Sequence, residues 1–465
     1  MFSPVKFFIG SVPLTVALTC QWLGDAQVFA VELVGRAVLP SATFASGPTS
    51  GWLSSSANDV FVPFFEQQPV QGISAVLPGP KPGTFLIMPD NGFGSKVNSP
   101  DFLLRFYGVK PDFVTVKGGS GEVFPINLTT GKKLDSFNNE SFVQLNDRAA
   151  RVELPIVAEQ DVYPGSTNST NPNGIAVDSA IQSERLLTGG DFDIESFRQD
   201  ANGTYWFGDE FGPFLIHIAA DGELLQPPIP LPNFLEIGDR PLVQSPDHPT
   251  FANLPNDQER VAAANLPRSK GFEGTAINPS GTKLYAMLEG ALVADQQINR
   301  LLIHEFDIET EQYTGNVFAY RLEDSTHAIG DLTAINDHEF LVIERDNRQG
   351  DPNNPAFTTP AEFKRIYKID ITQSDREGFV AKELLVDLLN IRDPNEIGGN
   401  GTTNGIFTFP FVTIESVLPV DEQTLLVIND NNYPSSVGRT PGKPDDNEFI
   451  LIQLDRPLKL ETGKE

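Results

Sequence analysis

The chain has 465 residues, of which 40% are hydrophobic, and its 62 Asp and Glu outnumber its 33 Lys and Arg, giving a formal net charge of −29. The resulting field repels polyanions and argues against nucleic-acid binding through phosphates. The apolar content is sufficient for a large core, and 39 Gly and 37 Pro suit a turn-rich all-β protein. The charge is common among soluble acidic proteins, and it is also compatible with a divalent cation that would reverse the field locally.

The first 30 residues have the pattern of a signal peptide. Lys6 precedes the apolar run Phe7–Cys20, and Val28-Phe29-Ala30 has the small residues that a cleavage site requires. The run is too short, and too interrupted by proline, for a stable membrane span. We therefore predict a signal peptide at residues 1–30 and one large domain at residues 31–465, secreted or periplasmic and monomeric.

Two features of the mature chain bear on its stability. The one cysteine, Cys20, lies within the predicted signal peptide, so the mature chain has no disulfide, zinc thiolate or thiol nucleophile. Val31–Leu39 reads as a strand that can pair with the C-terminal strands and close a ring of sheets. We therefore expect stability to come from burial, ring closure or bound metal.

A strand–turn–strand unit recurs along the rest of the chain. In most copies an acidic residue stands near the outer end of each strand, and a third strand follows. Repeats of several strands at spacings of tens of residues indicate a propeller or another repeat array. We predict an all-β fold, a β-propeller of about six blades, with a further blade concealed in residues 118–188. The five visible copies are residues 72–90, 190–213, 270–289, 329–346 and 413–430.

The copy at residues 190–213 shows the pattern most clearly. Its two strands are joined by a turn at Asn202-Gly203, a pair that supplies the positive φ angles of a tight hairpin. The start of the first strand and the end of the second lie at the same edge of an antiparallel pair. Glu195, Asp209 and Glu210 are therefore expected at one rim.

Across the repeats these acids are expected to form a ring near a central channel. Clustered carboxylates repel one another unless they are protonated or neutralised. Sites built from oxygen ligands select hard cations, which favours Ca²⁺ over Mg²⁺ or Mn²⁺. The alternative is that each acid caps a strand end or pairs with an Arg of the next blade. The candidates are Asp90, Glu195, Asp209, Glu210, Glu273, Glu289, Asp331, Glu344, Asp346, Glu415 and Asp430.

Other catalytic patterns are weak or absent in the sequence. The five histidines are scattered and lack zinc-ligand spacing, and there is no G-x-S-x-G elbow or P-loop. Arg300, Arg345 and Arg365 lie near strand ends, where they can bind an anion or pair with neighbouring acids.

Three stretches resemble the phytase-like family, known as "esterase-like activity of phytase". They are Gly190–Ser196 with Trp206–Leu215, Asp90–Gly94 with Asn98–Phe102, and Lys270–Gly274 with Leu288-Glu289. The resemblance implies a β-propeller rich in Asp and Glu that hydrolyses phosphoric esters. Within the matching motifs it selects Asp90, Glu195, Asp209, Glu210, Glu273 and Glu289. Ser74 in the first repeat departs from the acidic pattern.

The expected function is a secreted phosphoric ester hydrolase, a phytase-like phosphatase or phosphodiesterase that uses carboxylate-bound Ca²⁺ to activate water. Glu195 or Glu273 would orient the water, and Arg300 or Lys270 would assist with the anion. The substrate would be a small-molecule or polymer phosphoester. Two alternatives remain open: a non-catalytic calcium-binding propeller that binds a partner or envelope polymer, and a metal-dependent lactonase or esterase.

Overall fold

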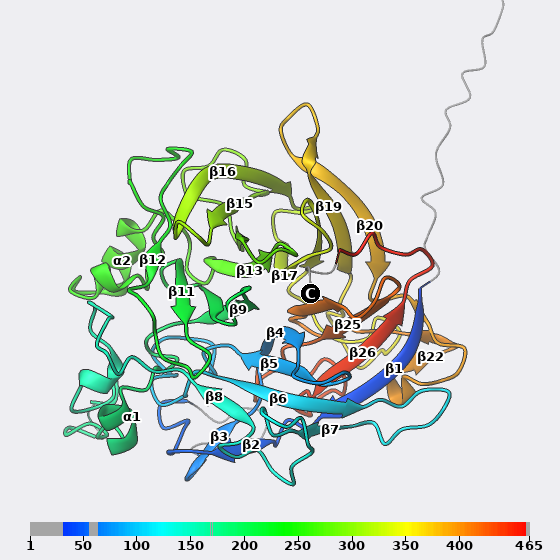
Figure 1. Cartoon of the computed structure of the whole chain (residues 1–465), viewed down its shortest axis with the longest axis horizontal. Coiled ribbons are helices and arrows are strands. Elements are labelled where there is room, and N and C mark those ends of the chain that lie inside the picture. Colours follow the sequence, from blue (N-terminus) through cyan, green and yellow to red (C-terminus); the bar gives the residue numbers. More distant parts are fainter. Residues whose placement is uncertain (1–30, 55–63, 168, 170, 462–465) are drawn as a thin grey trace, which may run out of the picture.

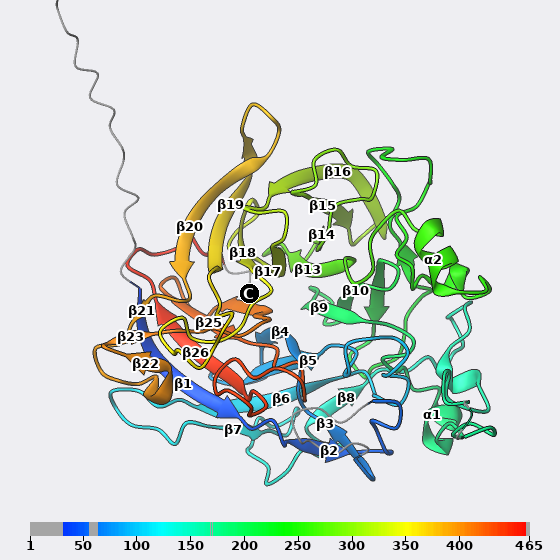
Figure 2. The same ribbon diagram turned by 180° about the vertical axis from the view of Figure 1, so that it is seen from behind.

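The computed structural model describes residues 31–54, 64–167, 169 and 171–461. The signal peptide expected at residues 1–30 lies outside the described residues. The described chain is built almost entirely of strands arranged around a central axis (Figure 1), and the same ring is seen from behind in Figure 2. The prediction of an all-β propeller is confirmed.

Each blade has four antiparallel strands; three blades are separate sheets, and a parallel pairing of β1 with β7 joins the first and fifth blades into one larger sheet. From the axis outward, the blades are β4 (Ile73–Pro78), β5 (Phe85–Pro89), β6 (Arg105–Asp112) and β7 (Glu122–Pro125); β9 (Ile194–Gln199), β10 (Tyr205–Asp209), β11 (Phe214–Ile218) and β12 (Ile229–Pro230); β13 (Phe272–Ile277), β14 (Lys283–Leu288), β15 (Arg300–Asp307) and β16 (Gln312–Arg321); β17 (Ala328–Ala334), β18 (Glu339–Arg345), β19 (Lys364–Ser374) and β20 (Val380–Asp387); and β24 (Ser416–Pro419), β25 (Thr424–Ile428), β26 (Asn447–Gln453) and β1 (Glu32–Leu39).

The described residues form five blades, one fewer than the sequence predicted. The inner strands β4, β9, β13, β17 and β24 contact one another in that order, and β24 returns to β4. The sixth blade expected in residues 118–188 is not found there. Much of that segment lies at the edge of the first blade, where β8 (Phe142–Gln144) pairs with β6.

Shorter elements lie outside the blades. The helices α1 (Ser179–Glu184) and α2 (Asp257–Ala263) lie at the periphery of the ring (Figure 1). The remaining elements are β2 (Phe44–Ser46), β3 (Gln67–Pro69), β21 (Ile391–Arg392), β22 (Thr402–Thr403), β23 (Ile406–Phe407), and 3-10 helices at Val157–Glu159, Pro249–Phe251 and Gly399–Gly401.

The two ends of the chain meet in the fifth blade. β1 pairs antiparallel with β26, from Glu32 opposite Gln453 to Leu39 opposite Asn447. The first described strand is thus the outermost strand of the last blade, as expected for Val31–Leu39. Pairing between the chain ends closes the ring without a covalent link.

Apolar side chains fill the space between neighbouring blades. Successive residues of a strand face opposite sides of its sheet, so each blade contacts both neighbours. In β10, Tyr205 and Phe207 pack toward the first blade, whereas Trp206 between them packs toward the third. Five such buried clusters separate the five blades, which accounts for closure of the ring by burial.

The first strand of each hairpin begins with a local irregularity. In four blades one residue is skipped in the pairing with the second strand, as in a β-bulge, which re-aims side chains and offsets register by one residue. In the fifth blade Glu415 stands directly before β24, at the corresponding place. The skipped residues are Ser74, Glu195, Glu273 and Gly330.

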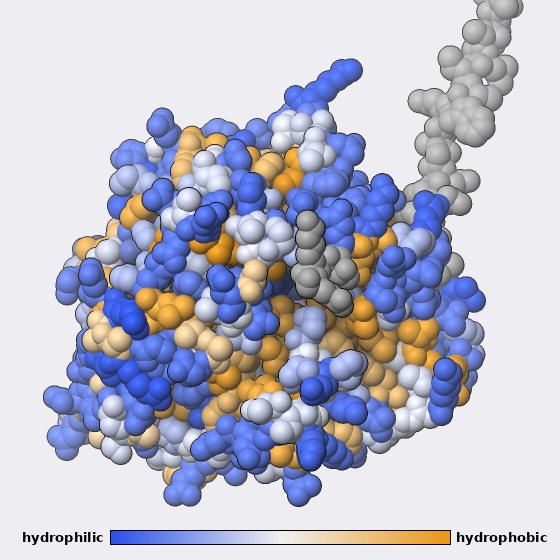
Figure 3. Space-filling view, viewed as in Figure 1, coloured by the Kyte–Doolittle hydropathy of each residue, from blue (hydrophilic) through white to orange (hydrophobic). Residues whose placement is uncertain are grey.

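Hydrophilic side chains cover much of the face shown in Figure 3, with hydrophobic patches between them. This distribution accords with the strongly negative net charge. In the part of the chain that the structure describes, no helix combines the length and apolar character needed to cross a bilayer.

Candidate metal centre

The four bulged residues, with Glu415 of the fifth blade, form one ring of equivalent positions. A second ring lies beside it, formed by the residue at the end of the second strand in each blade. In three blades the residue at this position donates its N–H to the carbonyl two residues before the bulge. In the fourth blade this position is occupied by Arg345, which pairs with Ala328, and in the fifth blade it is occupied by Asp430. The three equivalent bonds join Asp90 to Gly72, Glu210 to Asp193, and Glu289 to Gly271.

The second ring, together with Glu195, Glu273 and Glu415 of the first, lines one cavity of about 250 Å³ where the inner hairpins end. Two cations, Lys270 and Arg345, also line it. Eight carboxyl groups therefore face two cationic side chains, a surplus of negative charge that favours a bound cation. The carboxyl groups belong to Asp90, Asp193, Glu195, Glu210, Glu273, Glu289, Glu415 and Asp430.

Existing partners occupy only part of this acidic set. Glu289 accepts hydrogen bonds from Lys270 and from Nη2 of Arg345 at 3.4 Å. Glu415 accepts from the same Nη2 at 3.2 Å and from the Ser74 hydroxyl at 3.1 Å. The serine that departs from the acidic pattern thus supplies a donor to the carboxylate of the neighbouring blade.

Within the described residues, three buried carboxylate oxygens of the cavity have no hydrogen-bond partner: Oδ1 of Asp193, Oε1 of Glu210 and Oε1 of Glu273. Their side chains belong to residues that are 4–5% exposed. A buried polar atom without a partner carries a desolvation cost. A cation would remove that cost, because oxygen donors are the ligands of hard divalent ions.

The geometry also suits metal coordination. One carboxylate oxygen each from Asp193, Glu195 and Glu210 lie within 4.8 Å of one another, as do single oxygens from Glu210, Glu273 and Glu289. Each group can contribute three oxygen ligands to an ion. The residues present therefore fit a divalent cation.

Crowding and burial of these acids shift their pKa values. Burial, together with neighbouring acids, raises the pKa of Asp193 to about 7 and that of Glu415 to about 8. Burial opposes the charge of Arg345, but Glu415 and Glu289 raise its pKa overall. Burial is also the main reason that the pKa is raised at Asp90, Glu195, Glu210, Glu273 and Asp430.

Six of the candidate residues named from the sequence lie outside this cavity. Asp209 precedes the ring residue Glu210, and its oxygens accept from the backbone N–H groups of Asp193 at 2.9 Å and Gly212 at 2.7 Å. Asp331 follows the bulged Gly330 and accepts from Arg198 at 2.9 Å. Asp209 is thus one residue away from a residue that lines the cavity, and Asp331 is one residue away from the bulged position of its strand.

Glu344 shows the same offset, because its neighbour Arg345 occupies the ring position. Its carboxylate is buried and accepts from Tyr320 and Lys382, both at 2.6 Å. Arg300 is held by Asp295 through two hydrogen bonds of 2.8 and 2.9 Å. The structure therefore gives no support to a metal-binding role for Asp209, Asp331 or Glu344, or to an anion-binding role for Arg300.

Asp346 and Arg365 also lie outside the cavity. Asp346 accepts from the backbone of Glu362 and forms an ion pair with Lys364. The Nε atom of Arg365 lies 3.7 Å from Oδ2 of Asp387, an ion pair. For these residues the alternative stated from the sequence, a structural role at strand ends, describes what the structure shows.

The sequence analysis did not select Asp193. The signal was its spacing of two residues from Glu195, since residues at i and i+2 of a strand share a face. Asn347, Thr413 and Asn432 also line the cavity and were not predicted. Asn347 and Asn432 follow second strands of their blades, and Thr413 is the first residue of the fifth copy, but none of the three carries a charge that would mark it in the sequence.

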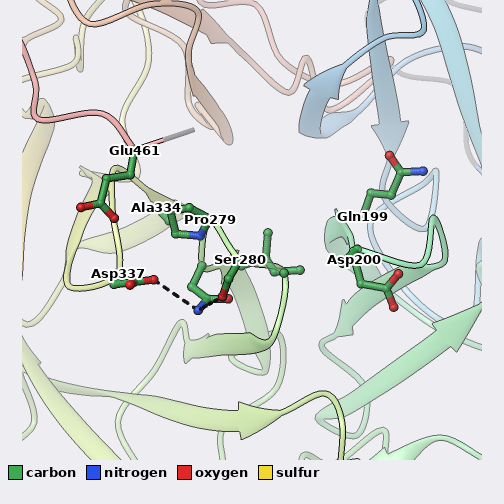
Figure 4. A pocket seen from close by; sticks show the side chains of 11 residues that line it. Gln199, Asp200, Pro279, Ser280, Ala334, Asp337 and Glu461 are labelled. Carbon is green, nitrogen blue, oxygen red and sulfur yellow. Dashed lines mark hydrogen bonds between the residues drawn. The ribbon is translucent and has the colours of Figure 1, made fainter. Parts of the chain in front are cut away.

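A larger cavity of about 740 Å³ is lined by the turns that join β9 to β10, β13 to β14 and β17 to β18. Asp200 lies across it from Asp337 and Glu461 (Figure 4). Asp200 accepts from Asn202 and Thr204 within its own turn. The carboxylate of Asp200 thus stabilises its own turn, so we place the candidate site in the smaller cavity.

Comparison with known proteins finds a family whose model matches most of the chain. The family model described as "Phytase-like: Esterase-like activity of phytase" matches residues 68–433. An "Uncharacterized secreted protein" of Arthroderma benhamiae is 25% identical over 215 residues, which cover 40% of each chain. The matched region thus spans well under two thirds of that relative.

Solved structures show weaker similarity. A protein of unknown function from Dyadobacter fermentans has a TM-score of 0.38 at 10% identity, covering 91% of this chain and 99% of that one. A calcium-binding protein, regucalcin, from Agrobacterium tumefaciens has a TM-score of 0.35 at 10% identity, covering 91% and 98%. Likeness at this level carries no argument, and the fold stands on the strand pairing described above.

Proposed function

Because the chain belongs to the phytase-like family and gathers eight carboxyl groups in one cavity, we propose that it is a secreted, cation-dependent hydrolase of phosphoric esters. The secreted relative supports the proposed location. The observation that carries the proposal is the set of buried carboxylate oxygens without partners at Asp193, Glu210 and Glu273.

Ca²⁺ fits this donor set best, with Mg²⁺ or Mn²⁺ as alternatives, because all the side-chain ligands are oxygens. The residues that would hold an ion are Asp193, Glu195, Glu210, Glu273 and Glu289. When bound, such a cation supplies positive charge to phosphate oxygens and lowers the pKa of water.

The other groups of the cavity have roles that follow from their positions. Arg345 has a buried Nε without a hydrogen-bond partner, and this N–H can bind a phosphate oxygen. Lys270 adds a second positive charge at the cavity wall. Glu273 offers its unpartnered Oε1 to an ion, and its other carboxylate oxygen can accept a proton from a water molecule and orient it.

The test is hydrolysis of a panel of phosphomonoesters and phosphodiesters by residues 31–465, with added Ca²⁺ and with a chelator. We expect activity with Ca²⁺, loss of activity with chelator, and a decrease of at least about a hundredfold in Glu273→Gln if this residue is the general base. Arg300→Ala is the matched control, because its guanidinium lies outside the cavity. Absence of turnover on every phosphoester would refute the proposal.

Lactones and carboxylic esters belong in the same panel, because the family description names an esterase-like activity. Hydrolysis of these compounds alone would replace phosphoric esters with carboxylic esters as the substrate. Calcium binding that raises the melting temperature without any hydrolysis would identify a non-catalytic calcium-binding propeller.

A further inference from the structure

Glu210 stands between the two groups of potential metal ligands. It belongs both to the group with Asp193 and Glu195 and to the group with Glu273 and Glu289. Its Oε1 is buried and has no hydrogen-bond partner. A carboxylate has two oxygens and can therefore serve a ligand position on each side.

Each group contains a second oxygen that also lacks a partner. On one side it is Oδ1 of Asp193, and on the other it is Oε1 of Glu273. Both residues are only 4% exposed, so water from the bulk does not readily satisfy them. The unpartnered atoms are thus distributed over both groups rather than concentrated in one.

The two groups differ in their cationic neighbours. Glu289 forms ion pairs with Lys270 and with Arg345. No Lys or Arg forms an ion pair with Asp193 or Glu195 in the described residues. An ion in the group that contains Glu289 must compete with Lys270 for that carboxylate, whereas an ion in the other group meets no such competitor.

We propose that the cavity holds two divalent cations bridged by Glu210, a tightly bound ion on Asp193 and Glu195 and a weakly bound ion on Glu273 and Glu289. Binding of the weak ion displaces Lys270 from Glu289. The freed ammonium group then faces the cavity, where it binds an anionic substrate group. The pair of sites rests on the proposed cation-dependent function, but it is measured by binding without turnover.

The experiment is calorimetric titration of chelator-treated residues 31–465 with CaCl₂ at neutral pH. We expect two ions per chain with distinct affinities. Asp193→Asn should remove the tight site and leave one weak ion, whereas Glu210→Gln should weaken both sites. Circular dichroism and thermal melting of each variant establish that it is folded.

Lys270→Met is the decisive variant. Removal of a neighbouring positive charge should strengthen the weak site by about tenfold or more and change the tight site, which shares Glu210 but not Glu289, by a smaller factor. The matched control is Lys283→Met, which removes a lysine of the same blade whose partner, Glu305, lies 3.0 Å away and outside the cavity. That control should change neither site.

One bound ion in the wild type would overturn the proposal, as would unchanged weak binding in Lys270→Met. If Glu210→Gln does not fold, the contrast between Asp193→Asn and Lys270→Met still decides the outcome. Two bound ions without hydrolysis of any ester would defeat the proposed hydrolase and retain the two sites. Hydrolysis supported by a single bound ion would retain the proposed hydrolase and overturn the two sites.

Discussion

Replacement of Asp193 by Asn should change the sign of its effect on stability when Ca²⁺ is added. Burial and neighbouring acids raise the pKa of Asp193 from 3.8 to about 7. In the metal-free protein a raised carboxyl pKa means that stability falls as pH rises through this interval, because the folded state retains a proton that the unfolded state has lost. The residue is buried, so solvent provides little screening.

A shift of about three units corresponds to about 4 kcal/mol, at about 1.4 kcal/mol per unit. In chelator at about pH 8, Asp193→Asn should therefore raise the unfolding free energy by up to about 4 kcal/mol. Below the ordinary pKa of 3.8 both states are protonated and the gain should disappear. With saturating Ca²⁺ the variant should be less stable than the wild type, because it has lost a ligand.

The assay is urea unfolding at about pH 8 and at a pH below 3.8, each with chelator and with Ca²⁺. Asp191→Asn is the control, because this buried acid accepts from Val157 and Thr188 and lies outside the acidic cavity. Burial also raises the pKa of Asp191, to about 6, so its replacement changes stability with pH in the same direction, but the effect should be the same with Ca²⁺ as in chelator. An effect of Asp193→Asn that is equal under all conditions would refute the reasoning about this cavity.

Two further predictions concern the scaffold of the site. Arg198→Met should lower the unfolding free energy by about 3–5 kcal/mol, measured by urea denaturation, because it leaves Asp331 buried without its cation; a loss below about 1 kcal/mol would contradict a structural role for the pair. Gly271→Ala should weaken calcium binding measured by calorimetry, because the added Cβ would lie 2.4–2.7 Å from backbone atoms of Glu210. Unchanged affinity in a folded Gly271→Ala variant would show that Glu210 adapts without cost to its ligand position.

The repeated hairpins were readable in the sequence because turn residues and alternating apolar strands recur at each copy. The pairing of Val31–Leu39 with the C-terminal strands was readable for a similar reason, since a strand-like segment stood apart from any hairpin of its own. The number of blades was not, because residues 118–188 contain short strands that add to the edge of the first blade rather than forming an inner hairpin.

The site was predicted to within one residue in several blades. Glu195, Glu273 and Glu415, which were chosen from the sequence, line the cavity, whereas Asp331 follows the bulged Gly330 and lies outside it. A bulge shifts the register by one residue, and in a strand this reverses the face to which a side chain points. Acidic residues at neighbouring positions cannot be distinguished without knowing where the bulge falls.

The pairing of β1 with β26 has a consequence for the order of assembly. The acidic cavity draws on hairpins from the first and the fifth blades, including Asp90 and Asp430. A chain emerging from its N-terminus has β1 available from the start, but its partner strand comes more than 400 residues later. The ring around the cavity is thus closed only after β26 has been made, although the five residues proposed to hold ions, from Asp193 to Glu289, are made earlier.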